Sequence, residues 1–206
     1  MRALQFAQRW KQLAQEQGKN PEVRFEHFEL PLGSAIKDTR EVGAWVSIQP
    51  NFAVEDAVYT DRLEGRTRLL CPHTDIVNEG VPMMVGTDGM PKSMLYAIWS
   101  AMHHPDAAQR LDLISAIAAS SAAVGSYEGD LKSVLKPGVK TDIVVANPQI
   151  LQAFADGHLA EQYIEQALKP QNERKDVPVR DQVGNLEREI VKVFRQGKVV
   201  FDAKKK

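Results

Sequence analysis

A short apolar run at residues 81–85 leads into a Gly-Thr-Asp sequence that ends at Asp88, and this transition limits the folds open to the chain. Apolar runs of this length that stop at a turn are typical of buried parallel strands. Residues 23–28 form a similar segment, which ends beside His27. We therefore expect parallel strands whose carboxyl ends present an imidazole and a carboxylate, as in a metal hydrolase built on a barrel.

Segments with helical periodicity alternate with these strands. The expected helices cover residues 2–17, 36–42, 72–78, 93–102 and 112–124, and a further strand covers residues 44–48. Alternation of this kind is the signature of parallel βα units. Residues 51–67 are charged and irregular, which predicts a long loop after the middle strand.

The character of the sequence changes near residue 130. A strand is predicted at residues 141–146, helix at 149–168, an exposed polar stretch at 169–180, and a hairpin that turns at Gln196-Gly197. We therefore divide the chain into residues 1–130, which carry the βα units, and residues 131–206, a β-rich segment with a helix and a solvated basic tail.

Composition excludes several classes of partner. The 206 residues carry a net charge of −1, with acidic and basic residues interspersed, so we do not expect nucleic-acid binding. The apolar stretches are too short to span a bilayer, so we expect no membrane partner. The single cysteine, Cys71, rules out an internal disulfide and predicts a buried structural thiol. We expect a cytoplasmic protein.

Three short motifs follow one another in a set order. They are Glu26-His27, the Ser-x-Gln-Pro sequence of residues 47–50, and Gly86-Thr87-Asp88. Together they resemble the ends of barrel strands six, seven and eight in the amidohydrolase superfamily, and its amidohydrolase-3-like branch in particular. The passages 135–145 and 196–200 resemble the closing strands of that family. The resemblance implies an α/β fold: the last three βα units of a TIM-like (β/α) barrel, followed by a small β unit of a composite sandwich.

The resemblance also implies a chemistry. Members of the amidohydrolase superfamily are metal-dependent hydrolases. We therefore expect a metal-activated water to attack carbon–nitrogen non-peptide bonds, such as amides, in a small-molecule substrate. Asp88 would be a metal ligand and the catalytic carboxylate, and His27 a second ligand, with zinc the favoured ion. Judged on the residues alone, His27 could instead be bonded structurally at a strand end, and Asp88 could be a turn residue before Gly89.

Two further residues are candidates for substrate binding. Gln49 could hydrogen-bond a substrate from its strand end, or it could shape the turn before Pro50. Arg68 could hold a substrate anion, although a surface salt bridge is the simpler expectation. The other histidines are expected in surface or helix-capping positions; they are His73, His103, His104 and His158.

The rest of the expected metal site is missing from the chain. The superfamily carries a His-x-His pair at its first barrel strand, and no such pair occurs here. Two protein ligands do not hold a catalytic zinc. We therefore expect a fragment that pairs with a missing N-terminal half, or with a second copy, through its open sheet edges. The alternatives are a non-catalytic, truncated or degenerate half-barrel that acts as an interaction module, and an unrelated α/β ligand-binding protein.

Overall fold

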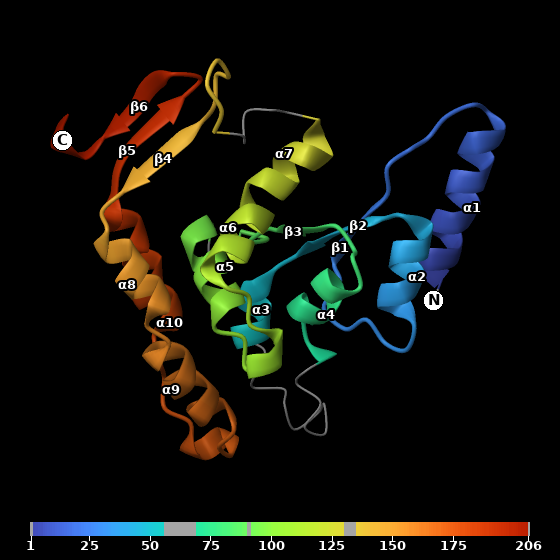
Figure 1. Ribbon diagram of the computed structural model, residues 1–206. Helices are drawn as coiled ribbons and strands as arrows, with labels where there is room; N and C mark the ends of the chain where they lie inside the picture. The colour runs from blue at the N-terminus through green and yellow to red at the C-terminus, as the bar shows by residue number, and fades with distance from the viewer. Residues whose placement is uncertain (1, 56–68, 90–91, 130–134, 206) are drawn as a thin grey trace.

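The structure, a computed structural model, describes residues 2–55, 69–89, 92–129 and 135–205. Within these ranges the strands form two three-stranded sheets, one in the order β1-β2-β3 and the other in the order β4-β5-β6 (Figure 1). The first sheet is parallel and the second is antiparallel. The predicted mixed α/β fold with a parallel sheet is therefore confirmed.

The elements alternate along the first part of the chain as the sequence predicts. The strands are β1 (Arg24–His27), β2 (Trp45–Ile48) and β3 (Met83–Val85). The helices are α1 (Arg2–Glu16), α2 (Ala35–Val42), α3 (Pro50–Glu55), α4 (His73–Asn78), α5 (Met94–Met102), α6 (Leu113–Ser120) and α7 (Ala122–Glu128).

The second part contains the antiparallel sheet and three more α-helices among its described residues. The helices are α8 (Gln149–Ala155), α9 (His158–Ala167) and α10 (Val179–Gly184), and the strands are β4 (Ile143–Ala146), β5 (Ile190–Arg195) and β6 (Lys198–Asp202). The β5–β6 hairpin turns at Gln196 and Gly197, whose φ angles are 49° and 81°. Two central residues with positive φ are typical of a type I′ turn, and this confirms the predicted hairpin.

The two faces of the parallel sheet differ in polarity. On β2, Val46 and Ile48 are completely buried against the helices, whereas Trp45 and Ser47 are half-buried on the opposite face. Tyr127 of α7 packs edge-on against Trp45, with ring centroids 5.5 Å apart. On β2, one face is thus apolar, and the other mixes polar and aromatic groups.

Helix α5 lies at the centre of the core. It is apolar on all sides, and its Trp99 is 1% exposed. The Trp99 indole donates a hydrogen bond to the carbonyl oxygen of Asp156, 3.0 Å away, which ties α5 to the turn between α8 and α9. Buried residues of α8 and α10 belong to the same core cluster as β2 and α5. The division of the chain near residue 130 stays a prediction.

Three helical segments differ from the sequence-based expectation. The loop predicted after β2 begins with helix α3, and its remainder lies outside the described residues. The alanine-rich helix breaks at Ser121, where the Ser120 and Ser121 hydroxyls both bond to the carbonyl of Ile117 and compete with the helical pattern. The helix predicted at residues 149–168 breaks at Asp156 and Gly157.

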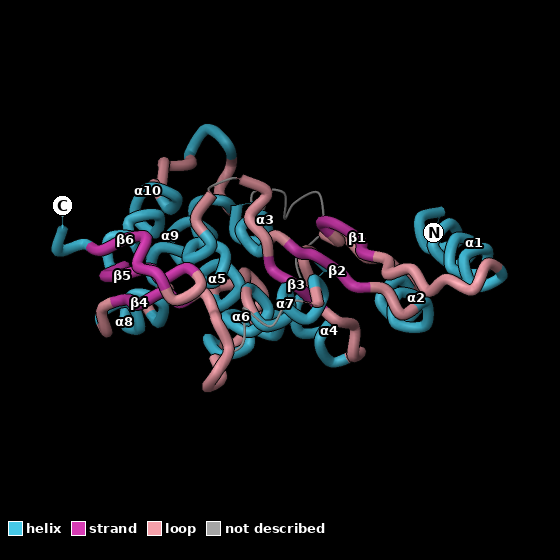
Figure 2. The backbone as a smooth tube through the Cα atoms, turned by 90° about the horizontal axis from the view of Figure 1, so that it is seen from above, coloured by secondary structure: helices cyan, strands magenta, loops and turns pink. Residues whose placement is uncertain are grey.

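The two ends of the molecule lie far apart. Seen from above, α1 and α2 occupy one end and the C-terminal hairpin the other (Figure 2). Helix α1 buries Leu4, Ala7 and Ala14, but three apolar side chains on it remain exposed: Phe6, Trp10 and Leu13. Among the described residues, no helix has the length and apolarity that crossing a membrane requires.

Candidate functional site

The register of the parallel sheet aligns the ends of its three strands. His27 pairs with Ile48, and Ile48 pairs with Val85. The carbonyl of Ile48 also accepts a hydrogen bond from the Gly86 amide, 2.8 Å away. Because the strands are parallel, their carboxyl ends lie along the same edge of the sheet. That edge carries His27, Gln49 and the turn that contains Asp88. This edge is our candidate functional site.

His27 has an unusual backbone conformation. Its φ is 67°, and the amide of Phe28 bonds to the carbonyl of Glu26 across it at 2.9 Å. This is the pattern of the classic γ-turn, which is rare and strained. Strain of this kind persists only where the surroundings hold it, and it is concentrated at functional sites. The His27 ring is half-exposed and stacks on Phe52, with centroids 6.2 Å apart.

Gln49 is a buried polar residue at the end of β2. It is 4% exposed, and its Oε1 has no hydrogen-bond partner among the described residues. A Cβ at Gly86 would lie 3.6 Å from Gln49 Nε2 and 3.8 Å from Ser47 Oγ, so the neighbouring strand end closes over the amide. A buried acceptor without a partner is costly and requires an explanation, which a missing donor would supply.

Asp88 lies on the exposed turn that follows β3. Its φ is 51°, in the left-handed region that aspartate tolerates better than most residues. The Thr87 hydroxyl accepts a hydrogen bond from the Gly89 amide, 3.2 Å away, and stabilises this turn. The Asp88 carboxylate makes no hydrogen bond or ion pair with the described residues. Both readings of Asp88, turn residue and ligand, fit this geometry.

The donors near this edge fit a metal ion in type but not in number. Imidazole and carboxylate are ordinary zinc donors. Within the described ranges, however, no group of three or more His, Cys, Asp or Glu side chains is placed to hold a metal ion. Arg68, the second predicted substrate-binding residue, lies outside the described residues. The site roles of all four predicted residues stay predictions.

Sequence analysis missed Glu29 near this edge, and it missed the contacts that Cys71 makes there. Glu29 Oε1 lies 3.3 Å from His27 Nδ1, and the backbone carbonyl of Glu29 accepts a hydrogen bond from the amide of Cys71 at 2.7 Å. The Cys71 thiol is completely buried, as predicted, and lies 4.0 Å from the Gln49 carbonyl oxygen. Cys71 thus connects the segments that follow β1 and β2. The only sequence signal for Glu29 was its spacing of two residues from His27.

The expectation of surface or helix-capping positions for the other four histidines is wrong for three of them. His73 and His104 are completely buried and meet edge to face, with ring centroids 5.1 Å apart. Burial, followed by the neighbouring His104, lowers the pKa of His73 to about 3. His103 is also buried and bonds through Nε2 to the Phe154 carbonyl oxygen at 2.8 Å. Only His158 is exposed as expected.

The roles of these buried histidines are structural. His104 lies 2.7 Å from the carbonyl of Leu70 through Nε2, and its Nδ1 accepts from the amide of Asp106 at 3.0 Å. Burial lowers the pKa of His104 and of His103. All three rings are therefore neutral at neutral pH, and the hydrogen bonds of His103 and His104 join the end of α5 to the segments around it. They do not offer a second candidate site.

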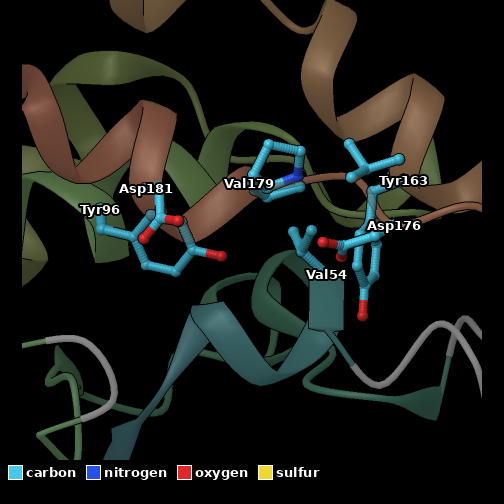
Figure 3. A pocket seen from close by; sticks show the side chains of 8 residues that line it. Val54, Tyr96, Tyr163, Asp176, Val179 and Asp181 are labelled. Carbon is cyan, nitrogen blue, oxygen red and sulfur yellow. The ribbon is translucent and has the colours of Figure 1, made fainter.

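A pocket of about 320 Å³ lies apart from the predicted residues, between α3, α5, α9 and α10. Figure 3 shows Tyr96 and Asp181 toward one side of the pocket, Tyr163 and Asp176 toward the other, and Val54 of α3 between them. Asp176 and Asp181 are exposed carboxylates. The pocket contains none of the four predicted site residues.

The comparison with protein families decides the assignment. Residues 2–201 match the description "Amidohydrolase family". The chain belongs to the amidohydrolase family. The assignment confirms the resemblance read from the three strand-end motifs, and it extends over nearly all of the sequence.

One solved structure agrees at the level of the fold. An uncharacterised protein of known crystal structure is 17% identical, with a TM-score of 0.50 over 87% of this chain and 41% of its own length. Two uncharacterised metal-dependent hydrolases also match. The one from Pyrococcus furiosus is 19% identical over 50% of this chain and 23% of its own, with a TM-score of 0.45. The one from Pyrococcus horikoshii OT3 is 16% identical over 59% of this chain and 27% of its own, with a TM-score of 0.49.

The lengths of these proteins differ greatly from that of this chain. The chain spans between 23% and 41% of the solved structures that it matches. A comparison with curated proteins gives no significant match.

Proposed function

We propose that this chain supplies the last three βα units of a metal-dependent hydrolase barrel, and that the completed enzyme cleaves carbon–nitrogen non-peptide bonds such as amides. The observation that carries this proposal is the parallel register, which brings His27, Gln49 and Asp88 to one edge of the sheet in a member of the amidohydrolase family. The small β4-β5-β6 sheet would belong to a composite sandwich.

Each residue at this edge has a proposed role. His27 and Asp88 would hold a divalent metal, zinc by the preference of such donors. The metal would supply a water of lowered pKa and polarise the substrate carbonyl. Asp88 would accept the proton of that water and return it to the leaving nitrogen. Gln49 and Arg68 would hold the substrate, Gln49 through the amide whose Oε1 has no partner.

The proposal requires further barrel strands beyond the described residues, because those residues provide too few donors for a catalytic metal site. The open edge of β1 and the exposed apolar side chains of α1 support the same requirement, since a parallel strand with its following helix would cover both. The partner would be an N-terminal half or another copy of this chain. A single, buried cysteine is in keeping with the proposed cytoplasmic location.

The direct test compares the chain alone with the chain co-expressed with a polypeptide that carries the remaining barrel strands. Translation of the nucleotide sequence upstream of the start in all frames would supply the natural candidate, recognisable by its His-x-His pair. We expect bound zinc and amide hydrolysis only in the completed complex. Asp88→Asn should lower the hydrolysis rate about 10²–10⁴-fold. Glu41→Gln, on the exposed surface of α2, is the matched control and should have no effect.

A complex that binds no metal, or an Asp88→Asn complex with unchanged activity, would refute the hydrolase proposal. It would favour the second candidate, a non-catalytic half-barrel that acts as an interaction module. The specific observation behind that alternative is the exposed apolar stripe of α1, formed by Phe6, Trp10 and Leu13. Contiguous exposed apolar surface of this kind marks interaction sites.

A further inference from the structure

The surroundings of the His27 ring distinguish its two nitrogens. Nδ1 lies 3.3 Å from Glu29 Oε1, while Nε2 makes no hydrogen bond with the described residues. Phe52 stacks against the ring with an angle of 24° between the planes and ring centroids 6.2 Å apart. The imidazole therefore presents one nitrogen to a carboxylate and leaves the other open.

The backbone, and not only a side-chain rotamer, places Glu29 beside this ring. The positive φ angles of His27 and Phe28, 67° and 51°, reverse the chain at the end of β1 and bring residue 29 back beside the imidazole. The hydrogen bond from the Cys71 amide to the Glu29 carbonyl then fixes the reversed segment to a completely buried residue. Three consecutive residues thus cooperate to hold the carboxylate near Nδ1.

We propose that Glu29 is a positioning residue for His27: its carboxylate accepts a hydrogen bond from Nδ1–H and so leaves the Nε2 lone pair free. The tautomer of a histidine is set by the bond that its other nitrogen makes. Imidazoles that ligate metals usually donate their second N–H to a carboxylate or carbonyl oxygen. The 3.3 Å separation is slightly longer than an ordinary N–H···O bond of about 2.7–3.2 Å, so the proposed bond requires a small rotation of the Glu29 side chain.

The inference rests on the proposed function for the role of His27, but its test does not require a metal. In the metal-free chain at pH 8, ¹⁵N spectra of the histidine rings report which nitrogen of His27 carries the proton. We expect the proton on Nδ1 in the natural protein. Glu29→Leu should move it predominantly to Nε2, whereas Glu29→Gln, which keeps a carbonyl oxygen as acceptor, should preserve the Nδ1–H form.

Glu26→Leu is the matched control, because it removes a carboxylate from the residue beside His27 that already pairs with Arg24. It should leave the His27 tautomer unchanged. A proton on Nε2 in the natural protein, or identical ring spectra in the Glu29→Leu variant, would overturn the inference.

Zinc titration of the completed complex gives a second measurement. Glu29→Leu should weaken zinc affinity about 10–100-fold, as loss of such a partner usually does, while Glu26→Leu should not. Equal affinity in the natural and Glu29→Leu complexes would contradict the positioning role. If the complex binds no zinc at all, the proposed function fails, and the ring spectra of the metal-free chain still decide the role of Glu29.

Discussion

Replacement of His73 by leucine should stabilise the protein and remove part of its sensitivity to acid. The His73 ring is completely buried, and neither of its nitrogens has a hydrogen-bond partner among the described residues. The nearby backbone of Gln109 opposes the lowering of the pKa, but it does not reach hydrogen-bonding geometry. Unsatisfied buried polar groups cost about 1–3 kcal/mol, and a leucine of similar size avoids that cost.

The pH dependence follows from the difference between the folded and unfolded states. The pKa of His73 falls from 6.5 to about 3 on folding, so between these values the unfolded chain binds a proton that the folded chain does not. Stability therefore decreases as the pH falls below 6.5. At about 1.4 kcal/mol per pH unit, His73 alone accounts for a loss of about 2 kcal/mol between pH 7 and pH 5.

Urea unfolding at pH 7 and pH 5, followed by tryptophan fluorescence, to which the buried Trp99 contributes, measures this effect. The free energy of unfolding of His73→Leu should fall by about 2 kcal/mol less than that of the natural protein over this range. His103 and His104 have lowered pKa values as well, so some acid sensitivity should remain. His158→Gln, at an exposed site, should behave as the natural protein does. Equal pH dependence in His73→Leu and the natural protein would refute the reasoning.

Three further substitutions test local features of the fold. Gly157→Ala would bring a Cβ within 2.8 Å of the fixed His103 ring, so the free energy of unfolding should fall by about 1–3 kcal/mol in thermal melting. Gly86→Ala is the control, because its nearest contact is at 3.6 Å, and its stability should not change. Asp112→Ala removes the cap that accepts from the Ser115 amide at 2.9 Å, and its melting temperature should be lower at pH 7. The Ser115 hydroxyl lowers the pKa of Asp112, so this deficit should shrink as the pH falls below 3.8. Gln196→Asn should stabilise the hairpin by about 1 kcal/mol, because asparagine tolerates the positive φ at this position. An unchanged midpoint of urea unfolding would contradict the turn geometry.

The candidate site was only partly accessible to sequence analysis. The motifs identified the strand ends at His27, Gln49 and Asp88, because a strand, its apolar run and the following turn are adjacent in sequence. The contact between Glu29 and His27 depends on a strained turn and on a hydrogen bond to Cys71, more than forty residues away by sequence number. No local pattern contains that information.

The sequence by itself determined the order of the strands, the parallel arrangement of β1, β2 and β3, and the C-terminal hairpin, but it did not predict helices α3 and α10. These features follow from periodicity and turn chemistry, which act over a few residues. Only the tertiary structure decided that His73 and His104 are buried together and that α8 and α10 share the core of the parallel sheet. Burial depends on which surfaces meet, and contacts between distant segments set that outcome.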